Sequence, residues 1–147
     1  MRLGIDLVDD AASARIARIA AHPLGRRLVF TAAELAGAAA LGERRRGEYL
    51  AGRFCAKEAV AKALGRGLGQ GLVWRDIEVV GDAHGAPVVT LHNGAAAIAE
   101  GHRIGRIEVS LTHQGGLVVC AAVALPQTGK PEPGSCRAPF LAAPDPS

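Results

Sequence analysis

The stretch YLAGRFCAKEAVAKALGRGLG (49–69) decides the fold of this 147-residue chain. It predicts a helix from about Arg45 to Leu64, because its apolar residues are spaced so that they give a helix one apolar side. Gly65 follows directly and is a typical helix stop. Glycines then alternate with other residues in GRGLGQG (65–71), which indicates a loop. The apolar side of the predicted helix consists of Tyr49, Leu50, Phe54, Ala61 and Leu64.

Shorter elements on both sides of this helix predict an α+β fold. Before it we expect a buried strand, a helix that Pro23 stops, and a short helix that begins at the capping box Thr31-Ala-Ala-Glu34. After it, two pairs of strands surround an Ala-rich helix that Asn93 caps. The two hairpins favour one domain with an antiparallel sheet packed by helices. The expected elements are Leu3–Val8, Ala11–Ala21, Ile77–Val80, Val88–Leu91, Asn93 to about His102, Ile107–Thr112 and Leu117–Leu125.

The composition is that of a globular protein without a membrane span. Hydrophobic residues make up 49% of the chain and charged residues 21%, which allows a buried core and argues against disorder. No apolar run reaches the roughly 18 residues that a membrane span needs. Because Asp6, Asp9 and Asp10 interrupt any signal-peptide core, we expect a cytoplasmic protein with no membrane partner.

The last residues differ in composition from the rest. Six of the eight prolines lie in residues 126–147, with few apolar residues between them. This predicts a domain over residues 1–125 and a disordered tail over residues 126–147. The three cysteines, Cys55, Cys120 and Cys136, form no CxxC pair, which argues against a disulfide framework or a zinc site. The two that lie in apolar runs are expected to be small core residues, although a lone thiol can also be catalytic.

The charges are distributed unevenly along the chain. Residues 1–75 hold 13 Lys and Arg against 7 Asp and Glu, a net +6, whereas residues 76–125 hold 2 against 5, a net −3. A basic half indicates an anionic partner, such as nucleic acid, a phosphorylated small molecule or an acidic protein. Because no aromatic residues alternate with the basic ones, we expect no nucleic-acid partner that stacks its bases on the protein.

Charged residues inside two predicted elements are the first candidates for chemistry. Asp6 lies in an apolar strand, where a carboxylate either binds a cation, pairs with an arginine or caps a helix. On the long helix, Arg53 and Lys57 are four residues apart, as are Glu58 and Lys62. These residues form either a solvated face with an ordinary ion pair or a site with a carboxylate for a divalent cation and basic groups for phosphate oxygens.

The glycine-rich loop and His113 leave further alternatives open. The loop lacks the end of a Walker A sequence, so its glycines form either a flexible turn or a backbone that approaches a diphosphate closely. His113 follows VSLT at the end of a strand. It is a phosphate ligand, an acid or base, or a turn residue.

Six segments of the chain form a set: GIDLVDD (4–10), FTAAEL (30–35), YLAGRFCAKEAVAKALGRGLG (49–69), WRDIEV (74–79), GAPVVTL (85–91) and VSLTH (109–113). Taken together, they resemble the holo-acyl-carrier-protein synthases, the small stand-alone 4′-phosphopantetheinyl transferases of bacteria. The similarity covers about residues 3–125 and is most specific in the glycine-flanked block that starts at Gly52. It implies the 4′-phosphopantetheinyl transferase fold, a homotrimer, and Mg²⁺-dependent transfer of phosphopantetheine from coenzyme A to a serine of apo acyl carrier protein, with release of 3′,5′-ADP.

The resemblance also implies roles for single residues. Asp6 and Glu58 match the acids that hold Mg²⁺, and Glu58 would help to remove the serine proton, directly or through a water. Lys62 matches a lysine that binds the pyrophosphate and neutralises developing charge. The matches for the rest of coenzyme A are Arg44, Arg45, Arg46 and Arg53 at the 3′-phosphate, Gly65, Gly67 and Pro87 around the nucleotide cleft, and His113 at that cleft.

Two departures from the family pattern limit what the resemblance implies. Gln114 follows His113, whereas several relatives have an aspartate there, so a base role for an acid at this position does not apply. Cys55 replaces the commoner alanine, which we interpret as a packing change.

The strand Leu117–Leu125 is apolar on both sides and would be an aggregation risk if exposed, which agrees with a homotrimer.

The predicted helix Ala11–Ala21 is expected to dock the carrier protein. Arg15 and Arg18 lie beside its apolar stripe, and carrier proteins of this kind are acidic around their serine. A merely solvated arginine face is the alternative. The client carrier protein serves fatty acid biosynthesis or a polyketide or other secondary pathway. The rival function is a non-catalytic module whose basic half binds an acidic protein or nucleic acid, but it gives no reason for an acid in the first strand.

Overall fold

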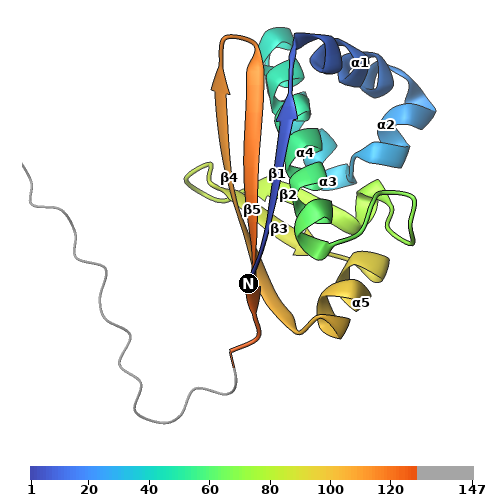
Figure 1. Ribbon diagram of the computed structural model, residues 1–147. Helices are drawn as coiled ribbons and strands as arrows, with labels where there is room; N and C mark the ends of the chain where they lie inside the picture. Colours follow the sequence, from blue (N-terminus) through green and yellow to red (C-terminus); the bar gives the residue numbers. More distant parts are fainter. Residues whose placement is uncertain (129–147) are drawn as a thin grey trace, which may run out of the picture.

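The predicted long helix is observed as α4, Glu43–Leu64, and the other elements are arranged around it (Figure 1). The structure, a computed structural model, describes residues 1–128. The helices before α4 are α1 (Asp10–Ala21), α2 (Pro23–Val29) and α3 (Ala32–Ala39). After α4 come a 3₁₀ turn, η1 (Trp74–Asp76), and the helix α5 (Asn93–Gly101). The strands are β1 (Arg2–Val8), β2 (Ile77–Gly81), β3 (Pro87–Leu91), β4 (Ile104–Gln114) and β5 (Leu117–Pro126).

The helix α4 is buried around most of its circumference, although its sequence predicts one apolar side. Strands β1 and β5 pack along one side, while α1, α3 and β2 contact the others. Alanine makes this packing possible, because its methyl group lets neighbouring backbones approach closely; Ala56, Ala59 and Ala63 are completely buried. At Gly4 in β1, an added Cβ would overlap the carbonyl oxygen of Ala59. The close contact between β1 and α4 therefore requires glycine at this position.

The expected single antiparallel sheet is divided into two. The larger sheet has the order β1-β5-β4, and the smaller one is the β2–β3 hairpin. In the larger sheet Asp6 lies opposite Cys120, which in turn lies opposite Leu111. Because side chains alternate along a strand, these three residues are on the face that packs against α4. The α+β class and the predicted strands are confirmed.

Helices cover one face of the larger sheet and leave the other face open (Figure 1). On the open face, the side chains of Leu3, Ile5 and Leu7 are 60%, 54% and 55% exposed. Alternate residues of β5, including Val119 and Val123, are half-buried on the same face. An apolar sheet face of this kind is a typical protein–protein contact surface.

The first helix stops before Pro23 as predicted, since α1 ends at Ala21. Pro23 is also the first residue of the short helix α2, which the sequence did not predict; proline is favoured there because no backbone N–H is needed. His22 caps α2 by accepting hydrogen bonds from backbone N–H groups. Asn93 does not cap α5, whose N-cap is His92. Instead, the Asn93 side chain donates to Asp76 over 3.2 Å.

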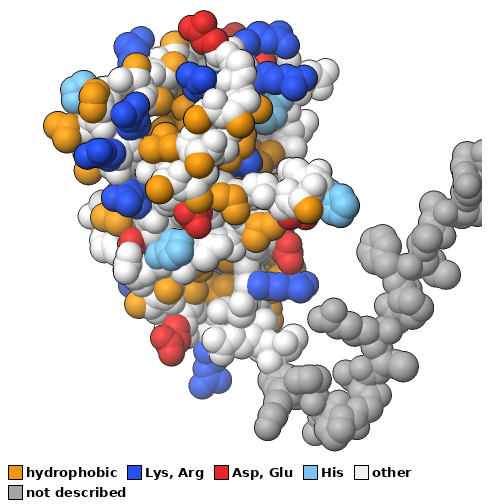
Figure 2. All heavy atoms as spheres, turned by 180° about the vertical axis from the view of Figure 1, so that it is seen from behind, with side chains coloured by type: hydrophobic (Ala, Val, Ile, Leu, Met, Phe, Trp, Pro, Cys, Tyr) orange, Lys and Arg blue, Asp and Glu red, His pale blue; other side chains and the backbone are white. Residues whose placement is uncertain are grey.

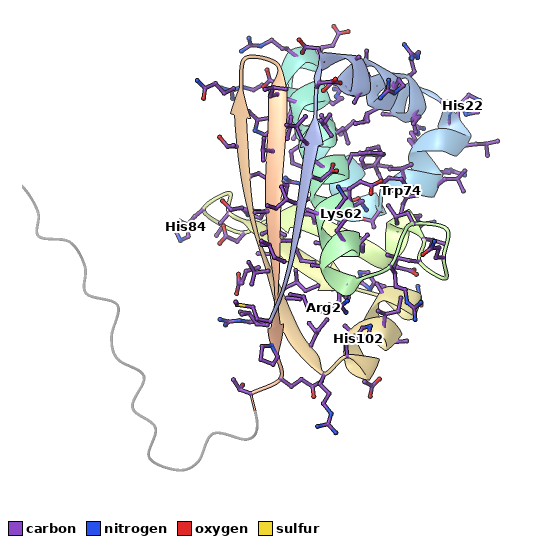
Figure 3. All side chains as sticks on the ribbon, in the orientation of Figure 1. Arg2, His22, Lys62, Trp74, His84 and His102 are labelled. Carbon is purple, nitrogen blue, oxygen red and sulfur yellow. The ribbon has the colours of Figure 1, made fainter. Side chains whose placement is uncertain are left out.

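The C-terminal end of α4 is held by Arg2 from the first strand (Figure 3). Arg2 donates a hydrogen bond of 3.1 Å to the carbonyl oxygen of Leu64. Gly65 closes the helix with a φ of 73°, and a Cβ at this position would overlap the Arg2 guanidinium. Gly65 is therefore favoured by its left-handed backbone, and a larger residue would also displace the Arg2 side chain. This contact ties the start of the glycine-rich loop to β1.

Most of the predicted tail, residues 126–147, lies outside the described residues, and so does Cys136. Only the first three positions of the tail are described. Strand β5 extends to Pro126, and the backbone N–H of Gln127 donates to the carbonyl oxygen of Arg103. The predicted domain boundary at residue 125 is thus close to the end of the last strand. Among the helices of residues 1–128, none is long and apolar enough to cross a membrane.

Candidate active site

The contact between β1 and α4 brings Asp6 and Lys62 together; Lys62 is labelled on α4 in Figure 3. Lys62 Nζ lies 2.8 Å from Asp6 Oδ1 and donates a second hydrogen bond, of 2.9 Å, to the carbonyl oxygen of Ile5. The Asp6 side chain is 15% exposed and that of Lys62 is 51% exposed. Asp6 is therefore paired with a lysine, and neither caps a helix nor pairs with an arginine. This pair is open to solvent on the lysine side.

Glu58 lies one turn before Lys62 on α4 and interacts with the same pair. Burial raises the pKa of Glu58, the nearby Asp6 carboxylate raises it further, and Lys62 partly opposes both effects. The raised pKa indicates that two carboxylates repel each other in a partly dehydrated place. A bound cation would relieve this repulsion, so Asp6 and Glu58 form a candidate metal site.

The carboxylate oxygens of Asp6 and Glu58 suit Mg²⁺ better than a metal that takes all of its ligands from the protein. Within residues 1–128, no group of three or more His, Cys, Asp or Glu side chains is placed to hold a metal ion. Mg²⁺ commonly binds to one or two carboxylates and takes its remaining oxygens from water and substrate phosphates. Asp6 and Glu58 would hold the ion, and Lys62 would face the same phosphates.

Two thiols lie close to Asp6, and neither is a candidate nucleophile. Cys55 on α4 and Cys120 on β5 are completely buried. Burial, followed by the Asp6 carboxylate, raises the pKa of Cys55 to about 12 and that of Cys120 to about 11. Both thiols therefore stay protonated at neutral pH, and a thiolate is the reactive form of cysteine. The expectation that these two cysteines are small core residues is confirmed.

Other residues predicted to bind coenzyme A lie at the opposite end of α4. Arg45 is exposed in the first turn of the helix. His113 Nε2 is 3.4 Å from the carbonyl oxygen of Glu48, beside a cavity of about 330 Å³. Thirteen residues separate Arg45 from Glu58, which corresponds to about 20 Å along a helix. Within one chain, Arg45 is thus separate from Glu58, whereas His113 lies beside the part of α4 between them, near Glu48 and Gly52.

Arg46 and Arg53 make contacts within the protein that the sequence did not predict. Arg46 donates to the carbonyl oxygens of Ala38 and Leu41, over 3.3 and 3.2 Å, and so caps the end of α3. Arg53 is 8% exposed, and its guanidinium lies 4.0 Å from the centre of the Tyr49 ring. Its Nε is buried without a hydrogen-bond partner. Five residues separate Arg53 from Glu58, so the two side chains lie about 140° apart around α4.

The predicted glycines and proline of the nucleotide cleft lie in two places. Gly65 and Gly67 follow Lys62 within about one helical turn, at the end of α4 that carries the carboxylates. Pro87 begins β3 opposite Gly81, at the turn of the smaller hairpin. Arg15 is exposed on α1, and so is Arg18.

Lys57 has a role that the sequence did not predict, since its spacing places it with three other charged residues on one or two adjacent stripes of the helix. Lys57 and Glu34 are both completely buried, with Nζ 2.9 Å from Oε2. Lys57 also donates to the carbonyl oxygens of Trp74 and Ile77. Glu34 accepts from the backbone N–H groups of Thr31 and Val79. The capping box at Thr31 contained the signal for this network, because it predicted a hydrogen-bonded Glu34.

Comparison with known proteins agrees with this geometry. A family model described as the 4′-phosphopantetheinyl transferase superfamily matches residues 2–119. The chain belongs to the 4′-phosphopantetheinyl transferase superfamily. At the level of sequence, it is 42% identical over 134 residues to the holo-[acyl-carrier-protein] synthase of Moorella thermoacetica, covering 91% of this chain and 99% of that relative. The family resemblance drawn from the six sequence segments is confirmed.

Solved structures share the fold. The holo-[acyl-carrier-protein] synthase of Neisseria meningitidis superposes with a TM-score of 0.71 at 30% identity, covering 84% of this chain and 96% of that one. The corresponding enzyme of Bacillus anthracis, solved in complex with CoA (3′,5′-ADP), gives a TM-score of 0.69 at 26% identity over 86% and 96% of the two chains. The chain is therefore a transferase of the holo-[acyl-carrier-protein] synthase type.

Proposed function

We propose that this protein is an Mg²⁺-dependent holo-[acyl-carrier-protein] synthase, which transfers 4′-phosphopantetheine from coenzyme A to a serine of an apo acyl carrier protein. The observation that carries the proposal is the partly open group of Asp6, Glu58 and Lys62 where β1 meets α4. Family membership and the CoA-bound relative from Bacillus anthracis support the substrate. The reaction belongs in the cytoplasm, where coenzyme A and carrier proteins are used.

The chemistry follows from the charges of these three side chains. The serine oxygen forms a bond to the β-phosphorus, the bond from that phosphorus to the bridging oxygen breaks, and 3′,5′-ADP leaves. Glu58 accepts the serine proton as the general base, directly or through a water. Lys62 moves its hydrogen bonds to the pyrophosphate and stabilises the charge that develops on the leaving group. Mg²⁺ held by Asp6 and Glu58 would supply positive charge beside the pyrophosphate.

We further propose that the complete coenzyme A site lies between two subunits. In coenzyme A, only the ribose separates the 3′-phosphate from the pyrophosphate. Arg45 therefore lies too far along α4, about 20 Å from Glu58, to bind the 3′-phosphate of a coenzyme A held by Asp6 and Glu58 of the same chain. A neighbouring copy can supply this arginine. Gly65, Gly67 and Pro87 would line the nucleotide cleft, and the buried Arg53 reaches it only if its side chain turns away from Tyr49.

A homotrimer is the assembly that we propose for this shared site. The open face of the larger sheet supports self-association, because Leu3, Ile5 and Leu7 expose more than half of their side chains there. Covering such a face gains about 25 cal/mol for each Å² of apolar surface removed from water. Light scattering at micromolar concentration should give about three times the chain mass. A stable and fully active monomer would overturn this part of the proposal.

The carrier protein is proposed to dock on α1. Arg15 and Arg18 are both exposed on this helix. Replacing both by glutamate should slow association and raise KM for the carrier protein, because opposed charges act mainly on encounter. Affinity for coenzyme A should stay unchanged. If coenzyme A affinity falls while the carrier-protein kinetics hold, the two arginines belong to the nucleotide site.

The experiment that tests the function is a mass measurement. The protein is mixed with coenzyme A, Mg²⁺ and an apo carrier protein, and the carrier protein should gain the mass of one phosphopantetheine. No gain with carrier proteins of fatty acid and polyketide synthesis would favour a non-catalytic module that uses its basic half to bind an acidic protein. Comparing rates between the two kinds of carrier protein decides which is the client.

A further inference from the structure

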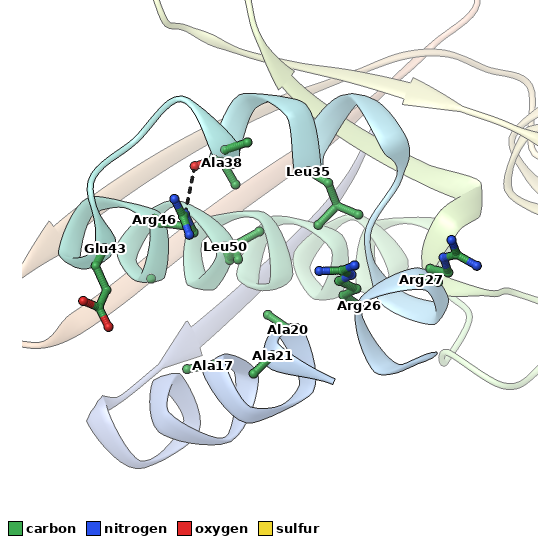
Figure 4. Close-up of a pocket in the computed structure, with 12 residues that line it drawn as sticks. Ala17, Ala20, Ala21, Arg26, Arg27, Leu35, Ala38, Glu43, Arg46 and Leu50 are labelled. Carbon is green, nitrogen blue, oxygen red and sulfur yellow. Dashed lines mark hydrogen bonds between the residues drawn. The ribbon is translucent and has the colours of Figure 1, made fainter. Parts of the chain in front are cut away.

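A cavity that contains none of the proposed reacting groups lies between α1, α2, α3 and α4 (Figure 4). Its volume is about 680 Å³, within the range of ligand pockets. Leu50 and Ala38 form its buried floor, and Leu35 is half-buried beside them. The walls are methyl groups from α1 and α3: Ala17, Ala20, Ala21 and Ala39. Asp6, Glu58 and Lys62 do not line this cavity.

The rim of the cavity is basic. Arg26 and Arg27 from α2 and Arg46 from α4 line it, against the single acid Glu43. Arg46 is held at the edge by its hydrogen bonds to the end of α3, one of which is drawn in Figure 4. Figure 2 shows basic side chains gathered around exposed apolar surface on one part of the protein. An apolar interior with an excess of two positive charges at its opening matches a ligand with an apolar body and a negative end.

We propose that this cavity binds a single-chain amphiphile with an anionic head group, such as a fatty acid or an alkyl phosphate. The chain would lie on Leu35, Leu50 and the alanine methyl groups. The head group would accept hydrogen bonds from Arg26 and Arg27, whose guanidinium groups suit both carboxylate and phosphate. Arg46 keeps its hydrogen bonds to α3 and adds positive charge. Alanine walls favour a slender alkyl chain, because they offer close contact and no polar group to orient a larger ligand.

The test is isothermal titration of the wild-type protein with decanoate, decyl phosphate and neutral decanol, each below its micelle-forming concentration. Because binding is measured without coenzyme A, Mg²⁺ or carrier protein, its outcome is independent of the transferase proposal. At least one of the two anions should bind once per chain and about tenfold or more tightly than decanol, since a hydrogen bond to a charged group is worth about 1.5–3 kcal/mol. The anion that binds better identifies the head group.

Two pairs of variants locate the binding. Replacing Arg26 and Arg27 by glutamine should weaken anion binding about tenfold, whereas the same change at Arg15 and Arg18 alters net charge equally and should have no effect. Ala17→Leu should block the cavity, and Ala14→Leu is its control, because Ala14 is exposed on the same helix but does not line the cavity. Ala17 is also exposed, so leucine there does not enter the core. Thermal melting confirms that each variant folds.

The proposal is overturned by any of three results. Equal affinity for decanol and for both anions would show that the arginines play no part. Unchanged binding by Ala17→Leu would place the amphiphile elsewhere, for example on the open face of the larger sheet. A lack of binding by all three compounds would leave the cleft to a protein partner.

Discussion

Two lysines of α4, five residues apart, each pair with a carboxylate from another element, and the two pairs differ in burial and in their further partners. Lys57 and Glu34 are completely buried, and hydrogen bonds to four backbone groups surround them. Lys62 and Asp6 have similar geometry, 2.8 Å against 2.9 Å, but Lys62 is half exposed. The closed pair has no room for another partner. The open pair can exchange its partner for a substrate.

The difference in burial between the two pairs indicates which charged residues stabilise the fold and which are available for chemistry. The closed pair joins α3, α4, η1 and β2 through its backbone contacts, so it fixes the helix that carries Glu58. In the open pair, the carboxylate also faces a second acid, Glu58, which is costly unless a cation is present. Charge repulsion at a partly open place is typical of a functional site.

Breaking the closed pair should have the largest effect on stability. Lys57→Met leaves Glu34 buried without its cation, which should lower the free energy of unfolding by about 3–5 kcal/mol. Denaturant unfolding measures this change. As a control, the double variant Lys57→Met/Glu34→Leu removes both charges and should recover part of the loss. If Lys57→Met were as stable as the wild type, the closed pair would have no structural role.

Removing the proposed base should have the next largest effect, and it should appear in turnover. Glu58→Gln keeps the shape but loses the charge, so kcat should fall on the order of 10²-fold or more, as for loss of other preorganised electrostatic groups. Excess Mg²⁺ should restore little. Near-normal turnover of Glu58→Gln would remove this residue from the mechanism.

Lys62→Met should separate binding from folding. It should weaken coenzyme A binding about tenfold, because a charge-assisted hydrogen bond to the pyrophosphate is lost. The free energy of unfolding should change by no more than about 1 kcal/mol, since Lys62 is half exposed. Titration with coenzyme A measures the binding affinity, and urea unfolding measures the free energy of unfolding. A large stability loss with normal coenzyme A binding would make the open pair structural, like the closed one.

The smallest expected effect is a gain in stability at neutral pH for Glu58→Gln. The raised pKa means that folding favours the protonated form of Glu58. This favourable contribution is present below the ordinary pKa of 4.5 and is lost as pH rises through the raised value. Glutamine lacks the charge, so the variant should melt a few degrees above the wild type at pH 7 and no higher at pH 4. A lower melting temperature at pH 7 would contradict the repulsion between Glu58 and Asp6.

The sequence predicted elements well where local signals were strong. The capping box at Thr31 and the glycine after Leu64 marked real helix ends. The division into two sheets was not predictable, because it depends on how distant strands pair. Pro23 illustrates a local ambiguity: the same residue ends one helix and begins the next, and its sequence context does not distinguish the two.

The candidate site was also predictable in part, because some of its residues carry local sequence signals. The four-residue spacing of Glu58 and Lys62 places them on one side of a helix, and Asp6 is an acid in an apolar strand. Burial around α4 is a property of the tertiary structure, so spacing alone grouped the buried Lys57 with Glu58 and Lys62, which remain partly exposed. Arg53 was likewise placed with the phosphate-binding residues, whereas its guanidinium lies over Tyr49.

The central claim is that the open pair works with Mg²⁺ in phosphopantetheine transfer. The most direct measurement is the initial rate of mass gain by an apo carrier protein at increasing Mg²⁺, for the wild type and for Asp6→Asn. We expect Asp6→Asn to lose on the order of 10²-fold in rate at limiting Mg²⁺ and to recover partly when Mg²⁺ is in excess, because its defect is metal affinity. A rate close to that of the wild type at limiting Mg²⁺ would show that Asp6 does not hold the metal in this reaction.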